Sequence, residues 1–70
     1  MATEIVFEVT DAIEGGYVAS ALGCGITTQA DSMAELREMV RDAVACYFDD
    51  PAVAPKVIRL HYVRDEILAA

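Results

Sequence analysis

The sequence predicts an α+β domain in which one helix packs on one face of a mainly antiparallel sheet, with its elements in the order β-β-β-α-β. Three observations support this class. Apolar residues alternate with polar ones near both ends of the chain, glycines punctuate the first half, and a capped amphipathic helix lies between the two alternating regions. The 70 residues are few enough for a single domain, residues 1–70.

The first half of the chain predicts three short strands joined by glycine-rich turns. Ile5, Phe7 and Val9 alternate with residues that face the other way, as in a half-buried strand. The adjacent glycines of DAIEGG can take the positive φ angles of a tight hairpin. The glycines on either side of Cys24 predict a bulge or a turn. The three strands are expected at residues 4–10, 17–22 and 26–29.

The helix has the strongest local signal in the sequence. Ser32 and Glu35 form a Ser-x-x-Glu capping box, in which each side chain satisfies a backbone N–H at the helix start. Apolar residues then recur at helical spacing and form one stripe. Pro51 and Pro55 end the helix, because proline cannot continue it. The stripe consists of Met33, Leu36, Val40, Ala43, Val44 and Tyr47.

Alternation resumes after the prolines. Residues 56–63, KVIRLHYV, predict a fourth strand with Arg59 and His61 on its outward face. Residues 64–70 predict either the end of that strand or a frayed helical turn, and the pattern does not decide between them. The inward side chains of the fourth strand would be Ile58, Leu60 and Tyr62.

A single helix covers only one face of such a sheet, so the other face is exposed unless a second copy covers it. A chain of this size buries a small core and often gains stability by association. Its apolar share is 56%, slightly above the roughly half that is usual. We therefore expect a homo-oligomer, a dimer or a tetramer. The candidate interface residues are Val6, Val57, Arg59 and His61.

The formal net charge of −7 restricts the partners. Binding of nucleic acid through its phosphates needs clustered Lys and Arg, which this chain lacks, so no direct nucleic-acid contact is expected. A basic protein partner suits the charge better. The sequence shows neither a signal peptide nor an apolar run of membrane-spanning length, and no membrane association is expected. The unpaired cysteines indicate a cytoplasmic protein.

Three features of the sequence are candidates for chemistry, and each also has a structural explanation. Cys24 would need a base to act as a nucleophile, and His61 is the single histidine of the chain. Cys24 and Cys46 lie too far apart in sequence for a zinc motif, and no metal or other cofactor is expected. Asp31-Ser32-Met33 is similar to the Asp-Ser-Leu at which acyl carrier proteins bear phosphopantetheine. We favour a non-enzymatic protein over a carrier using Ser32 or a thiol enzyme using Cys24, because the N-cap role already explains Ser32.

The run GITTQADSMAEL resembles the HicB family of antitoxins. In that family a hairpin strand is followed by a stretch of the form Gly-Cys-x-Thr-x-Gly-Asp-Thr and then by a helix. Gly25, Thr28, Asp31 and Ser32 match this stretch, and Leu36 follows on the helix. The upstream GGYVASAL is similar to the second strand of the family, so the resemblance covers roughly residues 4 to 48.

The chain also departs from the HicB pattern. Ile26 stands where the family usually has Cys, and Ala30 replaces the usual Gly. Typical HicB chains continue into a C-terminal DNA-binding module, whereas this sequence leaves no room for one after the fourth strand. The resemblance is therefore to a short, solo form.

The resemblance implies a function without chemistry. HicB-type antitoxins bind a small basic HicA-type toxin, an mRNA-cleaving RNase, and mask its active site. This chain would do the same without binding DNA. The alternative is an orphan module of the same fold, a homo-oligomer with a regulatory or ligand-binding role.

Overall fold

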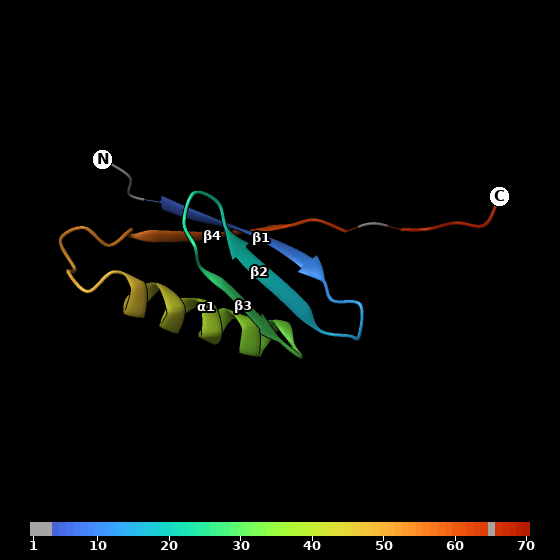
Figure 1. Cartoon of the computed structure of the whole chain (residues 1–70), viewed down its shortest axis with the longest axis horizontal. Coiled ribbons are helices and arrows are strands. Elements are labelled where there is room, and N and C mark those ends of the chain that lie inside the picture. The colour runs from blue at the N-terminus through green and yellow to red at the C-terminus, as the bar shows by residue number, and fades with distance from the viewer. Residues whose placement is uncertain (1–3, 65) are drawn as a thin grey trace.

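The computed structural model describes residues 4–64 and 66–70, which form a four-stranded sheet with one helix on one face (Figure 1). The element order is β-β-β-α-β, so the predicted α+β class and order are confirmed. The elements are β1 (Glu4–Asp11), β2 (Tyr17–Ala21), β3 (Thr27–Ala30), α1 (Met33–Tyr47) and β4 (Val57–Tyr62).

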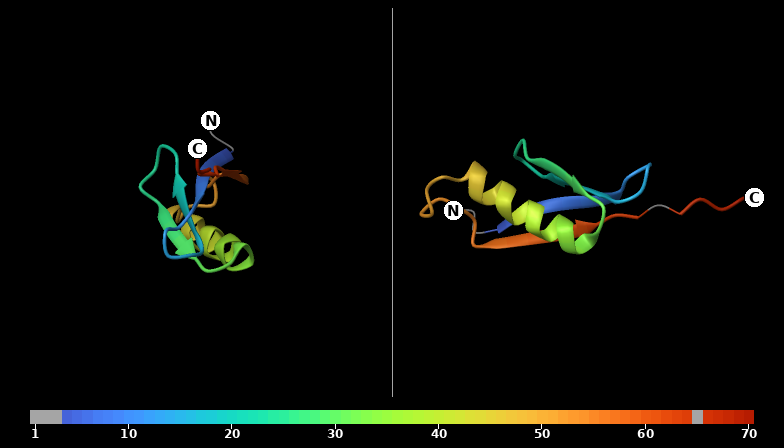
Figure 2. Two further views of the ribbon diagram at one scale, coloured as in Figure 1. Left: turned by 90° about the vertical axis from the view of Figure 1, so that its right-hand side faces the viewer. Right: turned by 90° about the horizontal axis from the view of Figure 1, so that it is seen from below.

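The sheet has the strand order β3-β2-β1-β4. β1 pairs antiparallel with β2 and parallel with β4, and β2 pairs antiparallel with β3. The sheet is therefore mainly antiparallel, as predicted. α1 carries the chain from the edge strand β3 to the opposite edge strand β4, because a parallel pairing requires a crossover of this kind. Figure 2 shows the helix on one side of the sheet, which leaves the other face open.

Glycines form both turns of the β1–β2–β3 meander. Gly15 and Gly16 adopt φ angles of 101° and 82° in the β1–β2 hairpin. The hairpin is closed by hydrogen bonds from Ala12 N–H to the Gly16 carbonyl, at 3.0 Å, and from Gly15 N–H to the Ala12 carbonyl, at 3.1 Å. In the β2–β3 connection Gly23 has a φ of 85°, whereas Gly25 does not take a positive φ. The predicted bulge or turn is therefore a turn.

The strand boundaries differ from the prediction by one residue at several ends. β3 begins at Thr27, because the carbonyl of Ile26 accepts a hydrogen bond from Ala21 N–H at 2.8 Å and closes the turn. The Ile26 side chain is buried in the core. β4 spans Val57–Tyr62, although Val63 still donates its N–H to the carbonyl of Val9 at 2.8 Å.

The start of α1 has the predicted cap. The hydroxyl of Ser32 accepts a hydrogen bond from Glu35 N–H at 3.2 Å. The Glu35 carboxylate accepts one from Asp31 N–H at 3.5 Å. Both side chains therefore bind backbone donors near the helix start, although the Glu35 carboxylate accepts from the residue before the N-cap and not from Ser32 itself.

The core lies between α1 and the sheet. Leu36, Val40 and Val44 of the predicted helical stripe are buried. Tyr47 is 55% exposed, so its assignment to the stripe is wrong. The helix ends there, and Phe48 packs against the core instead, in edge-to-face contact with the Tyr47 ring at a centroid distance of 4.9 Å. The buried core residues are Ile5, Phe7, Val9, Ala19, Ala21, Ile26, Ala30, Leu36, Val40 and Val44.

The β4 side of the molecule is less well covered than the rest. α1 packs mainly over β3 and β2, so Ile58 and Leu60 are only half-buried. Residues 66–70 project beyond β4 as an extended segment, which we call the arm (Figure 1). Arg64 and the arm form neither strand nor helix, so neither prediction for residues 64–70 holds where the structure describes them. Asp65 lies outside the described residues.

Candidate interaction surface

The open face of the sheet carries the four residues predicted as an interface. Alternation in β1 turns Val6 away from α1, and the parallel register places Arg59 of β4 beside it. Val57 and His61 precede and follow Arg59 on the same face, where Val57 is 51% exposed. The structure therefore brings the four residues together. Their role as an interface stays a prediction.

Opposite charges meet on this face. Arg59 donates through Nη2 to Oε2 of Glu4 at 3.0 Å, and both side chains contact solvent. This hydrogen bond, together with the negative charge of Glu4, raises the pKa of Arg59 above its ordinary value. Exposed ion pairs contribute little to folding stability, because water screens them. Glu8, which lies beside His61, is the second outward carboxylate of β1.

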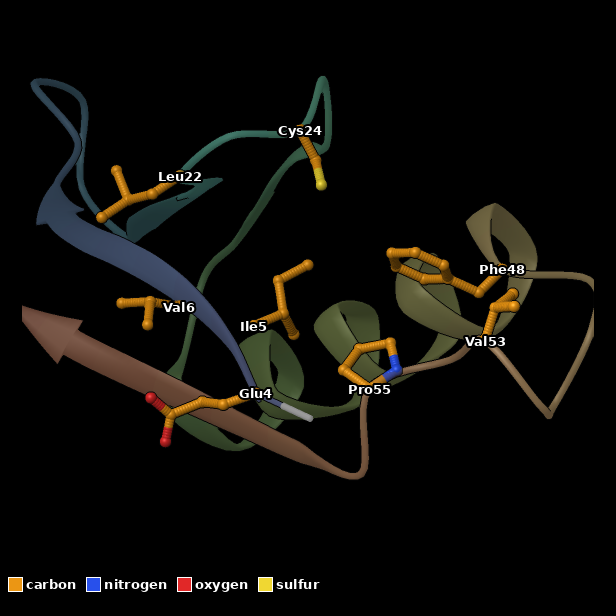
Figure 3. A pocket seen from close by; sticks show the side chains of 8 residues that line it. All are labelled: Glu4, Ile5, Val6, Leu22, Cys24, Phe48, Val53 and Pro55. Atoms are coloured by element: carbon orange, nitrogen blue, oxygen red, sulfur yellow. The ribbon is translucent and has the colours of Figure 1, made fainter. Parts of the chain in front are cut away.

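A mostly apolar pocket of about 350 Å³ lies at the end of the sheet where β1 begins. The start of β1, the β2–β3 turn, the residue after α1 and the α1–β4 connection form its walls (Figure 3). Figure 3 shows the Cys24 sulfur and the Phe48 ring directed toward the same space. The lining residues are Glu4, Ile5, Val6, Leu22, Cys24, Phe48, Val53 and Pro55. With so few polar groups, the pocket is suited to apolar side chains.

The sequence predictions missed this pocket. The segment that contains the helix-ending Pro51 and Pro55 also supplies Val53 and Pro55 to the walls. The sequence did contain a signal for this surface, because Val53 is an apolar residue where polar turn residues are usual. In the structure the Val53 side chain is 64% exposed. Leu22 at the end of β2, 57% exposed, is a second such residue.

A polar cluster at the other end of the sheet was also missed. Tyr62 donates its hydroxyl hydrogen to Oδ1 of Asp11 at 2.6 Å, and its oxygen accepts from Nη2 of Arg64 at 3.1 Å. Arg64 Nε lies 3.5 Å from Oδ2 of Asp11, and its guanidinium is 5.2 Å from the centroid of the Tyr62 ring. Tyr17 meets the Tyr62 ring edge-on at 5.9 Å. The cluster fixes the end of β4 and the direction of the chain leaving it.

The cluster predicts a pH dependence at alkaline pH. The hydrogen bond to Asp11 raises the pKa of Tyr62 above its ordinary value of 10.0. A raised folded-state pKa means that the stabilisation is complete below the unfolded pKa and is lost as the pH rises through the folded one. We expect Asp11→Asn to lower the ionisation midpoint of Tyr62 and to weaken this alkaline loss of stability. Ultraviolet absorbance of tyrosinate measures the midpoint, with Tyr62→Phe identifying the Tyr62 contribution. Asp49→Asn is the control, and equal midpoints in the two Asn variants would contradict the prediction.

The candidates for chemistry lie apart. Cys24 is half-buried at the pocket, Cys46 is exposed on α1, and both are free thiols. His61 lies on the outward face of β4 beside Glu8. The structure therefore does not bring His61 and Cys24 together as a base and a nucleophile.

The residues of GITTQADSMAEL occupy positions that shape the fold. Gly25 lies in the β2–β3 connection, and Thr28 lies in β3 on the side of the helix. Asp31, Ser32 and Glu35 make the hydrogen bonds at the start of α1. These five residues span the end of the meander and the start of the helix, and they do not line the apolar pocket.

Two features are absent from residues 4–64 and 66–70, the part of the chain that the structure describes. Within these ranges no group of three or more His, Cys, Asp or Glu side chains is placed to hold a metal ion. Over the same part of the chain, α1 included, no helix combines the length and the apolar character that crossing a membrane requires.

Comparison with known proteins identifies relatives in a bacterium and an archaeon. A UPF0150 protein of Thermotoga maritima is 41% identical over 66 residues, which cover 94% of this chain and 91% of the relative. A UPF0150 protein of Archaeoglobus fulgidus is 50% identical over 46 residues, 66% of this chain and 68% of the relative. No family model and no solved structure matches the chain. The similarity to the Thermotoga protein extends over nearly the whole of both sequences, and the chain therefore belongs to the UPF0150 family.

Proposed function

We propose that this protein is a non-enzymatic, HicB-like binding module that masks a small basic HicA-type toxin, an mRNA-cleaving RNase. The observation that carries the proposal is an open sheet face on a strongly acidic chain. Twelve Asp and Glu residues against five Lys and Arg give the net charge of −7. The motif stretch that resembles HicB supports the identity of the partner.

The open face suits a protein partner better than a small substrate. It is a broad strand surface on which Val6 and Val57 supply apolar contact, while Glu8 and His61 supply polar groups. Interfaces combine an apolar centre with a polar rim in this way. The acidic charge would speed encounter with a basic toxin and disfavour acidic partners.

Capture of the partner tests the proposal. We expect tagged protein recovered from its own cells under gentle conditions to carry one small basic protein in stoichiometric amount. In the reconstituted complex Glu8→Lys should weaken binding at least about tenfold, because it places like charges across the interface. Glu38→Lys, an equal charge change on the exposed side of α1, should weaken it much less. Recovery of copies of this chain alone would contradict the toxin partner.

The alternative function is an orphan homo-oligomeric module with a regulatory or ligand-binding role. A specific observation favours self-association: β4 is an edge strand, and its side chains are only half-buried or exposed. An unprotected edge can pair with the same edge of a second copy. Recovery of copies of the chain alone in the capture experiment would support this alternative.

A further inference from the structure

The arm presents apolar side chains to solvent. Ile67 is 95% exposed and Leu68 is 78% exposed, on an extended segment that projects from the body (Figure 1). The molecule consequently measures 51 × 22 × 18 Å along its principal axes. Two adjacent large apolar residues held away from the body indicate a contact that one copy does not make by itself.

The free edge of β4 can form such a contact. Val63 donates its backbone N–H to the carbonyl of Val9 in β1. Successive residues of a strand direct their N–H and C=O groups to alternate sides. The backbone groups of Ile58, Leu60 and Tyr62 consequently point to the open edge, where an antiparallel copy of β4 can pair with them.

Two-fold symmetry restricts the register of that pairing. The two-fold axis of such a dimer is perpendicular to the sheet. Residues that pair across the axis face the same side of the sheet, and one residue of β4 therefore lies at the axis, opposite its own copy. Arg59 on the axis would place two guanidinium groups opposite each other, which is unfavourable. With Leu60 or His61 on the axis, the arm of one copy runs past the start of β4 of the other, toward the α1–β4 connection that contains Val53 and Pro55.

The registers with Leu60 or His61 on the axis both lead the arm to the same place. Val53 and Pro55 line the apolar pocket at the start of β1. We infer that two copies of this chain pair through their β4 edges and exchange arms, so that Ile67 and Leu68 of each copy occupy the pocket of the other. The occupied pocket then consists of residues from both copies, and neither copy completes it alone.

The pocket and the arm match in size and charge. A dry apolar cavity of about 150 Å³ holds a molecule as large as benzene. The pocket of about 350 Å³ therefore has room for two aliphatic side chains. Glu66 of the arm would pass Lys56, which is exposed and follows the lining residue Pro55 in sequence. The apolar pair and the acidic residue of the arm thus each meet a complementary group.

The arm of a copy cannot fill its own pocket. The pocket lies at the end of the molecule where β4 begins, and the arm leaves the opposite end of β4 (Figure 1). The segment from Tyr62 to Ile67 has as many residues as the segment from Val57, where β4 begins, to Tyr62. A chain that folded back would use some of these residues for the turn and would stop short of the pocket. The second copy is therefore the occupant.

This inference goes beyond the proposed toxin binding and does not depend on it. Arm exchange uses the β4 edge and the pocket, whereas toxin binding is tested at Glu8, which does not line the pocket. Val6 belongs to both the open face and the pocket lining. A chain that binds no toxin can still exchange arms, and the reverse also holds. The experiments that follow use the purified protein alone, so their outcome is independent of the capture experiment.

Crosslinking tests where the arm lies. Cys24 faces the pocket, so Ile67→Cys in a Cys46→Ser background places a second thiol in reach of it. We expect a short bis-maleimide linker to give a covalent dimer as the main product, with peptides containing positions 24 and 67 joined. The same chain with Cys24→Ser should lose that product. A chain with Ile13→Cys instead of Ile67→Cys should not form it. Absence of the joined peptide would overturn the inference.

Dissociation tests whether the arm holds the dimer. The combined change Ile67→Asp and Leu68→Asp should raise the dimer dissociation constant at least about 100-fold, because two charges would have to enter an apolar pocket. Both side chains are exposed in the single copy, so the fold should be retained, and circular dichroism checks this. Ile13→Asp, at a fully exposed isoleucine of the hairpin, is the matched control. A monomeric parent protein, or a dimer equally stable in all three chains by sedimentation equilibrium, would overturn the inference.

Discussion

Phe7→Ala is expected to lower the free energy of unfolding by about 3–5 kcal/mol, the range for removing a buried aromatic side chain. Phe7 lies in β1, the strand that pairs with both β2 and β4, and its side chain is fully buried beneath α1. A chain of 70 residues has a total stability of roughly 4–10 kcal/mol. The substitution would therefore remove at least about a third of the stability, and at the lower end of this range it would leave the protein close to unfolding at ambient temperature.

Urea unfolding followed by circular dichroism measures the Phe7 effect. Ile13→Ala provides the control, because Ile13 is a large apolar residue with its side chain fully exposed. Exposed substitutions of this kind usually change stability by less than about 0.5 kcal/mol. Similar losses for the two variants would show that the space between α1 and β1 collapses around the smaller side chain, contrary to the expected cavity.

Local patterns were sufficient to predict the elements of this fold. The alternation of Ile5, Phe7 and Val9 correctly predicted the inward face of β1, because the two-residue period of a strand depends only on adjacent positions. The Ser32–Glu35 cap was predicted for the same reason, since both of its hydrogen bonds join residues close in sequence. Tyr47 was placed wrongly because periodicity does not show where the helix leaves the core.

The polar contacts and the pocket could not be predicted from local sequence patterns. Tyr62 and Asp11 are 51 residues apart in sequence, and Arg59 and Glu4 are 55 apart, so each pair depends on β4 lying parallel to β1. The pocket likewise combines the start of β1 with segments on either side of α1. Prediction of an uncovered face succeeded for Val6 and Val57, because a single helix can cover only one side of a sheet.

Gly16→Ala is expected to lower the free energy of unfolding by about 2–5 kcal/mol, through two separate costs. A side chain at a left-handed position costs about 1–2 kcal/mol, and Gly16 has a φ of 82°. An added Cβ would also lie 2.5 Å from the carbonyl oxygen of Ala30. Forcing an atom into occupied space costs about a further 1–3 kcal/mol. Ala30 ends β3 two residues before Ser32, the N-cap of α1, so a backbone shift there would disturb the helix start.

Gly15→Ala separates these two costs. Gly15 also has a positive φ, but an added Cβ at this position makes no close contact. Gly15 has a φ of 101°, and an added Cβ there would meet no atom within 4 Å. We expect Gly15→Ala to cost only about 1–2 kcal/mol. The difference between the two variants in urea unfolding measures the contact between the hairpin and the end of β3. Equal losses of stability in the two variants would mean that the end of β3 can move away from the added Cβ with no loss of free energy. The β1–β2 hairpin would then not determine where α1 begins.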